Sequence, residues 1–426
     1  MSPDPTAAGR PRARALRYLS TALIVVASAG VALYAAECVL ELLAMRARPG
    51  LNRNAFAAAR RAGRPFDVRS KSDVVRALES AGVRAYPAPV AQFFLGTADA
   101  GVPLRVVVAG RPVLPLSGVA NATTVLCNES GRFVVYDADE RGFRNPPGSW
   151  RPGAVALAAV GDSFTAGHCV ADDSAFVGRL RARVPATLAL GTAGAGPLFE
   201  LAMVREYLTA VRPRTVLWCY YENDLADLGN EQRNATLARY FGDPGFRQQL
   251  GEHQPEIDRQ LAAFFDAAIR HEAAAREEER RRQRALRSYL SLRLVREALR
   301  RARTRRAPAR PGDIALLLRV LGEARATVAS WGGELYFVFL PSWVRYAGRP
   351  SDDVPRSALA ARDSILRGLA AMTIPVIDAD AALRAHGAPT ALFAYPAAGA
   401  HYTAEGHGIV AEAIARRLGL PPRSAP

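Results

Sequence analysis

The sequence predicts an α/β fold with a mostly parallel sheet, because short apolar runs alternate with segments of helical pattern. The apolar runs that we interpret as buried strands are 154–160, 187–190, 215–221, 334–340 and 374–378. A final amphipathic helix is expected at 409–418. Helical crossovers between such strands imply parallel pairing with right-handed connections.

An apolar segment near the N-terminus predicts a transmembrane helix over 18–45. Its uncharged part, 18–36, is close to the roughly 20 residues that span a bilayer. The basic tail at 1–17 is typical of a signal-anchor with its N-terminus inside. We therefore expect one helix in the inner (cytoplasmic) membrane and an extracytoplasmic body. Signal-peptidase cleavage after Tyr34-Ala35-Ala36 is the alternative.

The rest of the chain divides by composition into an α/β domain and three additions. A juxtamembrane linker rich in Arg, Ala, Pro and Gly is expected at 46–70, and a small β-rich extension at 71–150. The α/β domain occupies 151–226 and 312–420, interrupted by a charged helical insertion at 227–311. This insertion is interpreted either as a solvated helical hairpin or as a lid or surface that meets anionic lipid or a partner.

The net charge of +16 comes almost wholly from arginine, since Lys71 is the only lysine. No nucleic-acid-binding motif accompanies this charge, so we expect no nucleic-acid partner and attribute it mainly to codon usage. The four cysteines form no zinc-type spacing with histidines, and we expect no metal and no cofactor. Cys127 and Cys169 lie near turns, where they form a disulfide outside the cytoplasm or remain two free thiols.

Gly161-Asp162-Ser163-Phe164 follows the strand at 154–160 directly. A buried strand that breaks at a glycine presents the next side chains at the carboxyl edge of the sheet, where open α/β sheets bind ligands. Ser163 is therefore a candidate nucleophile. The alternative is an ordinary strand-to-helix turn in which Ser163 or Thr165 caps the helix.

Three further loops carry the other groups that acyl transfer requires, namely Gly194, Asn223 and His401. In this order and spacing, with GDSF at 161–164 and Glu222-Asn223-Asp224, the chain resembles the SGNH/GDSL hydrolase family. The resemblance implies a three-layer sandwich with a flavodoxin-like sheet. It makes Ser163 the nucleophile and His401 the base. The Ser163 and Gly194 N–H groups and the Asn223 amide would form the oxyanion hole.

The chain departs from the family pattern at two places. Tyr221 stands where the third block has a glycine, and Ala398 and Gly399 stand where an aspartate usually precedes the histidine. The alternatives are a backbone carbonyl that orients His401, an acid from elsewhere in the chain, or weakened or lost activity. The remaining candidates for a distant acid are Asp378, Asp380 and Glu405.

We expect a serine esterase whose substrate is an acylated carbohydrate, such as an O-acetylated envelope polysaccharide, or a lipid-like ester. An O-acyltransferase using the same site is one alternative. A non-catalytic carbohydrate-binding or assembly protein with a degenerate triad is the other. The pattern Asn128-Glu129-Ser130 also matches an N-glycosylation site, to which we give little weight.

Overall fold

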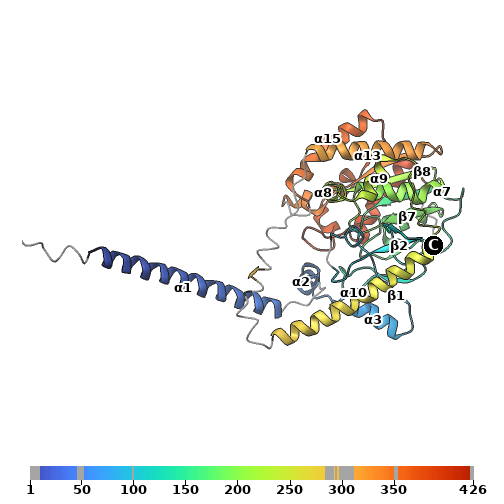
Figure 1. Cartoon of the computed structure of the whole chain (residues 1–426). Helices are drawn as coiled ribbons and strands as arrows, with labels where there is room; N and C mark the ends of the chain where they lie inside the picture. Colours follow the sequence, from blue (N-terminus) through green and yellow to red (C-terminus); the bar gives the residue numbers. More distant parts are fainter. Residues whose placement is uncertain are drawn as a thin grey trace, which may run out of the picture. The chain divides into compact units, whose positions relative to one another are not determined.

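The computed structural model describes residues 10–45, 52–97, 100–283, 292, 295–296, 311–349 and 354–422. The chain forms two compact units. One consists of Met1–Pro49 with Ala273–Arg305, and the other of Gly50–Glu272 with Arg306–Pro426. All of the candidate site residues belong to the second unit, which holds most of the helices and strands labelled in Figure 1.

The long helix α1 (Arg10–Met45) belongs to the first unit. Its segment Tyr18–Leu40 is long and apolar enough to cross a membrane. Most of the side chains in this segment are exposed in the isolated chain. The predicted helix over 18–45 is therefore present, and α1 extends it into the basic tail.

The second unit is built on a five-stranded parallel sheet. Its strands are β6 (Leu157–Gly161), β7 (Thr187–Gly191), β8 (Thr215–Tyr221), β9 (Glu334–Leu340) and β10 (Val376–Asp378). The spatial order is β7-β6-β8-β9-β10. Numbered within the sheet this is 2-1-3-4-5, the flavodoxin-like order, with its switch point between β6 and β8. The predicted fold class is confirmed.

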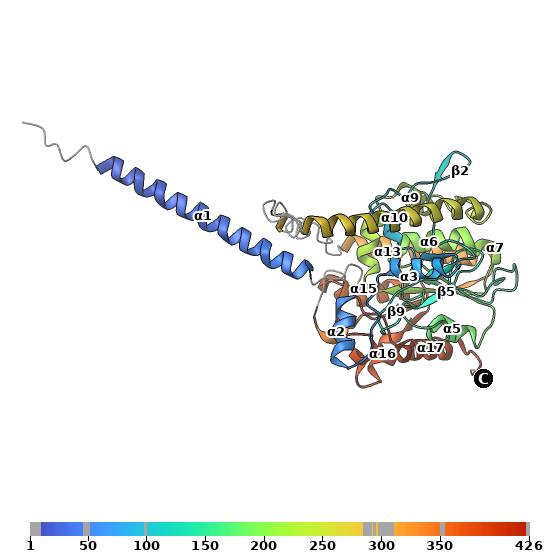
Figure 2. The ribbon, with the colours of Figure 1, turned by 90° about the horizontal axis from the view of Figure 1, so that it is seen from below.

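Alternate residues of these strands enter two separate cores, as the period of two in a strand requires. On β6, Ala158 and Val160 face one core, and Leu157 and Ala159 face the other. Helices cover both faces, which completes the three layers (Figure 2). The first core is covered by α6 (Pro197–Met203), α13 (Pro311–Ala329) and α15 (Arg356–Ala371), the second by α5 (Phe176–Arg181), α16 (Ala379–Arg384) and α17 (Ala404–Leu418).

The predicted insertion begins as part of the α/β core. Its helices are α8 (Asp224–Glu231), α9 (Ala235–Gly242) and α10 (Gln254–Gln283). Leu237, Tyr240 and Leu261 are fully buried in the first core. The interpretation as a solvated hairpin is thus wrong for this part. Most of 284–310 lies outside the described residues.

The N-terminal extension contains both strands and helices. Its small sheet has the order β1-β4-β5, with β1 parallel to β4 and β4 antiparallel to β5. The predicted linker is wrong in part, because 53–61 forms a helix in which Ala55 and Ala59 are buried. The elements of the extension are α2 (Arg53–Arg61), α3 (Lys71–Ser80), β1 (Ala85–Pro87), α4 (Ala91–Phe94), β2 (Val106–Val108), β3 (Arg111–Val113), β4 (Thr123–Val125) and β5 (Val135–Asp137).

The remaining short elements connect the larger ones. They are a 3₁₀ turn (Asp172–Ser174), a π-helical turn (Val204–Leu208), α7 (Thr209–Val211), α14 (Trp343–Ala347) and a second 3₁₀ turn (Pro389–Leu392).

Candidate active site

Ser163 lies at the carboxyl end of β6, at the switch point of the sheet. The chain can turn there because Gly161 has no side chain. A Cβ at this position would lie 2.3 Å from Thr165 Oγ1 and 2.8 Å from the Cys219 carbonyl oxygen. The Ser163 hydroxyl bonds His401 Nε2 at 2.9 Å and Asp162 Oδ2 at 3.4 Å, so it does not cap a helix. The capping alternative is wrong for Ser163.

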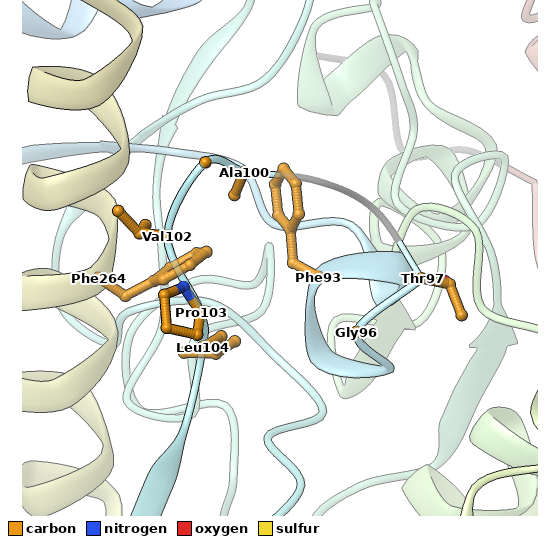
Figure 3. Close-up of a pocket in the computed structure, with 9 residues that line it drawn as sticks. Phe93, Gly96, Thr97, Ala100, Val102, Pro103, Leu104 and Phe264 are labelled. Carbon is orange, nitrogen blue, oxygen red and sulfur yellow. The ribbon is translucent and has the colours of Figure 1, made fainter. Parts of the chain in front are cut away.

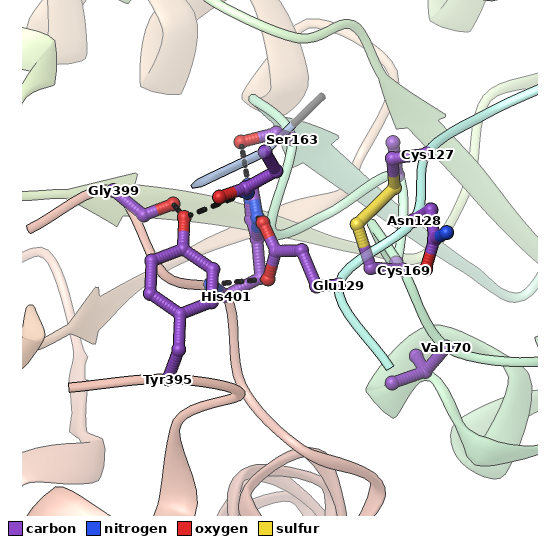
Figure 4. The surroundings of a disulfide bond; sticks show 12 residues. Cys127, Asn128, Glu129, Ser163, Cys169, Val170, Tyr395, Gly399 and His401 are labelled. Carbon is purple, nitrogen blue, oxygen red and sulfur yellow. Dashed lines mark hydrogen bonds and ion pairs between the residues drawn. A yellow bond between two sulfur atoms is a disulfide. The ribbon is translucent and has the colours of Figure 1, made fainter. Parts of the chain in front are cut away.

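His401 lies in the loop before α17, with its ring between two partners (Figure 4). Its Nε2 lies 2.9 Å from Ser163 Oγ, and its Nδ1 lies 2.8 Å from Glu129 Oε1. Its backbone N–H also donates to Glu129 Oε2 at 3.1 Å. Serine, histidine and carboxylate therefore form one continuous hydrogen-bonded chain.

Glu129 comes from the extension, between β4 and β5, and is separated from His401 by 272 residues of sequence. Its side chain is only 5% exposed. The sequence-based candidates for the acid were wrong, because each has another partner. Asp378 pairs with Arg362, Asp380 with Arg384, and Glu405 with His386.

A disulfide joins Cys127 to Cys169, whose Cα atoms are 5.2 Å apart. Of the two alternatives left open for these cysteines, the structure has the pair. Cys127 precedes Glu129 by two residues and Cys169 follows Ser163 by six. Predicting this disulfide from the sequence would have placed Glu129 near Ser163.

The pKa of His401 lies above its ordinary value. Burial acts to lower it, but the charge of Glu129 and the hydrogen bond to it raise it, with a smaller contribution from Asp162. The ring packs 4.9 Å from Phe164 and 4.9 Å from His168, measured between centroids. Burial and the neighbouring His401 hold the pKa of His168 well below its ordinary value, so His168 is a neutral neighbour.

Gly194 and Asn223 lie beyond the ends of the strands that flank β6. Gly161 pairs with Gly191 of β7 and with Cys219 of β8. Both predicted oxyanion-hole residues therefore follow the same edge of the sheet as Ser163. The Asn223 amide donates to Asp227 Oδ2 at 3.2 Å, which leaves its second N–H for another acceptor.

The contacts of two residues at this edge were not foreseen from the sequence. Gln92 of α4 lies over Gly194, whose φ of +69° is open to glycine, and donates to its carbonyl oxygen at 3.4 Å. Tyr221 stacks on Phe164 with ring centroids 4.0 Å apart. Phe164 also packs against the His401 ring, so it lies in contact with both Tyr221 and the base.

Two groups of side chains have metal-ligating atoms within 4.8 Å of one another among the described residues. One is Cys127, His168 and Cys169, and the other is Glu129, Cys169 and His401. Both depend on a cysteine that is bonded in the disulfide. A thiolate ligand is therefore available only after reduction.

No protein-family model matches the chain. A comparison with curated proteins also gave no match. Solved structures that are similar include a lipase/acylhydrolase from Enterococcus faecalis, at 15% identity and a TM-score of 0.35, covering 64% of this chain and all of that one. A member of the lipolytic G-D-S-L family from Veillonella parvula has 13% identity and a TM-score of 0.34, with 62% and 97% covered.

A catalytic mutant of an acetylxylan esterase from Geobacillus stearothermophilus is similar to the same extent. It has 15% identity and a TM-score of 0.34, with 65% of this chain and 100% of that one covered. A shared architecture does not carry a function, which has to be argued from the side chains of the site.

Proposed function

We propose that the protein is a membrane-anchored serine esterase that acts through an acyl-Ser163 intermediate. One observation carries the proposal, the hydrogen-bonded chain from Ser163 Oγ through the His401 ring to Glu129. Nucleophile, base and orienting acid need this geometry, and the distances of 2.9 and 2.8 Å lie in the range that proton transfer requires.

The reaction follows from these positions. As Ser163 Oγ attacks the ester carbonyl, its proton moves to His401 Nε2, and Glu129 stabilises the resulting imidazolium through Nδ1–H. The N–H groups of Ser163 and Gly194 and the amide of Asn223 are proposed to receive the oxyanion. His401 then gives the proton to the departing alcohol. Water, activated by the same base, releases the acid and restores Ser163.

The substrate that we propose is an O-acyl group on an envelope polysaccharide, with a lipid-like ester as the other candidate. An O-acyltransferase would use the same groups, with a sugar hydroxyl in place of water. The two are distinguished by supplying an acyl donor with and without polysaccharide. Acylated polysaccharide as the main product would establish the transferase, and free acid would establish the hydrolase.

The non-catalytic alternative was based on the missing aspartate. That argument no longer holds, because Glu129 fills the acid's place on His401 Nδ1. A degenerate site has no need to keep a carboxylate that is 5% exposed and aimed at the base.

The direct test is labelling of the full-length protein, in detergent, with a fluorophosphonate probe. The wild type is expected to be labelled and to hydrolyse p-nitrophenyl acetate, and Ser163→Ala is expected to lose both. Ser330→Ala, which removes a hydroxyl that donates to the Thr327 carbonyl oxygen, is the matched control and is expected to keep both. Labelling that survives in Ser163→Ala would reject the proposal.

We further propose that α1 anchors the protein in the inner membrane with the second unit outside the cytoplasm. The disulfide supports this orientation, since disulfides persist in oxidising compartments. A reporter that is active only in the periplasm, fused after Pro426, is expected to be active. A silent fusion together with an active cytoplasmic reporter would contradict the orientation.

A further inference from the structure

The disulfide connects the two segments that carry the acid and the nucleophile. Cys127 lies at the start of the turn that holds Glu129, and Cys169 lies at the end of the turn that follows Ser163 (Figure 4). Cys169 Sγ is within 4.8 Å of both a Glu129 carboxylate oxygen and a His401 ring nitrogen. The covalent link therefore lies directly against the acid–base pair.

The turn that carries Glu129 has other contacts, but they hold the turn itself and not the Glu129 carboxylate. Asn128 donates to the Asp67 carbonyl oxygen at 2.9 Å and accepts from Gly131 N–H at 2.9 Å. Among the described residues, the Glu129 carboxylate receives hydrogen bonds only from His401. The disulfide is the covalent link between this turn and the nucleophile turn.

We propose that the Cys127–Cys169 disulfide positions Glu129 against His401, so that the enzyme reaches its full rate only after this bond forms. The inference rests on the proposed esterase function. An error of about 1 Å in the position of a catalytic group can cost about 10²-fold in rate. We expect the reduced enzyme to lose that factor, because Glu129 then fails to hold His401 in most molecules.

The redox step balances as a thiol–disulfide exchange. The thiols of Cys127 and Cys169 give up two protons and two electrons to an incoming disulfide, such as oxidised glutathione, which leaves as two thiols. The chain would therefore be synthesised in a reducing compartment with a poorly oriented base. Activity would appear once the second unit meets an oxidising environment.

The test compares oxidised, reduced and reoxidised full-length protein in detergent. A phosphine reduces the disulfide to two thiols and becomes a phosphine oxide, with its oxygen from water. Reduction is expected to lower kcat for p-nitrophenyl acetate about 10²-fold and to shift the acidic limb of the pH profile to lower pH. Reoxidation with oxidised glutathione is expected to restore both. Cys38→Ser, which removes the exposed thiol of α1, is the control and should respond like the wild type.

The Glu129→Gln variant shows whether the disulfide acts through the acid. Reduction is expected to change the rate of Glu129→Gln less than about twofold, because the group that it positions has already gone. The double variant Cys127→Ser/Cys169→Ser is expected to match the reduced wild type and to ignore the phosphine. Equal losses on reduction in wild type and Glu129→Gln, or no loss in either, would overturn the inference.

A second readout does not depend on turnover. NMR titration of His401 in the wild type is expected to give a lower pKa after reduction, because the Glu129 charge moves away from the ring. An inactive oxidised wild type would reject the esterase proposal, while this titration would still decide the positioning. A His401 pKa that is the same in both redox states would overturn the inference.

Discussion

Glu129 contacts His401 twice, through Nδ1 at 2.8 Å and through the backbone N–H at 3.1 Å. The two contacts fix both the ring and the loop that carries it. A carboxylate in this position selects the tautomer with a proton on Nδ1, which leaves Nε2 free to accept from Ser163. The acid therefore determines whether the base can act.

Replacing Glu129 by Gln is expected to lower kcat by about 10³- to 10⁴-fold, comparable with the loss of the orienting acid in serine proteases. Glutamine keeps the volume of the side chain but permits the wrong tautomer. The measurement is steady-state hydrolysis of p-nitrophenyl acetate. Glu405→Gln, which removes the carboxylate paired with His386, is the control and should hydrolyse at the wild-type rate. A large loss in Glu405→Gln and none in Glu129→Gln would reverse the assignment.

The pH profile is expected to report the raised pKa of His401. Protonated His401 cannot take the proton of Ser163, so kcat/KM should rise with pH through a pKa above the ordinary value for histidine. Glu129→Gln removes the charge that raises the pKa of His401, and burial, which lowers it, then outweighs the smaller effect of Asp162. The acidic limb should therefore move to lower pH. A limb that does not move on this substitution would show that another group titrates.

Asn223→Ala is expected to lower kcat by about 10²- to 10³-fold, with a smaller effect on KM, if its amide stabilises the oxyanion. The donor matters more in the transition state than in the bound ester, because charge develops on the oxygen only there. Asn230→Ala, further along α8, is the matched control. Equal effects of the two substitutions would indicate a structural role for Asn223.

His407 makes the stability of the fold dependent on pH. Burial lowers its pKa to about 3, with smaller contributions from His401, Arg144 and Arg179. The unfolded chain binds a proton at the ordinary pKa, so this stability is complete above about pH 6.5 and is lost as the pH falls towards 3. The loss is about 1.4 kcal/mol per pH unit in this window.

The variant that tests this is His407→Phe, compared with the wild type by urea unfolding between pH 4 and pH 8. Removing the acceptor for the Phe176 N–H, at 3.3 Å, should destabilise the variant by about 1–3 kcal/mol at pH 8, where the histidine is neutral in both the folded and the unfolded wild type. Its stability should fall less steeply on acidification. Parallel curves for the two proteins would contradict the assignment.

The strands and the nucleophile turn could be predicted because their signals are local. Apolar runs such as 154–160 and 215–221 identify buried strands. The observed β8 has the predicted bounds, and β6 begins three residues later and ends one residue later than predicted. The glycine at position 161 marks the turn because no side chain fits there. Gly194 and Asn223 follow from the same reasoning, since the ends of parallel strands meet at one edge. His401 was assigned from the resemblance that the loop before the last helix carries.

The short extension could not be predicted equally well. Its strands contain only three residues each, too few for a periodic pattern, and β1, β3 and β4 were not predicted. The helix α2 was interpreted as linker because its composition is rich in Arg and Ala, although Ala55 packs in the second core. Small residues carry little hydrophobic signal even when they are buried.

The sequence by itself determined the α/β pattern, the turn at Ser163 and the loops that carry Gly194, Asn223 and His401. Only the tertiary structure decided which carboxylate meets His401 and which cysteines pair. A hydrogen bond between residues separated by 272 positions leaves no trace in local pattern. It depends on the extension folding back over the carboxyl edge of the sheet, where the Cys127–Cys169 bond links Glu129's turn to Ser163's.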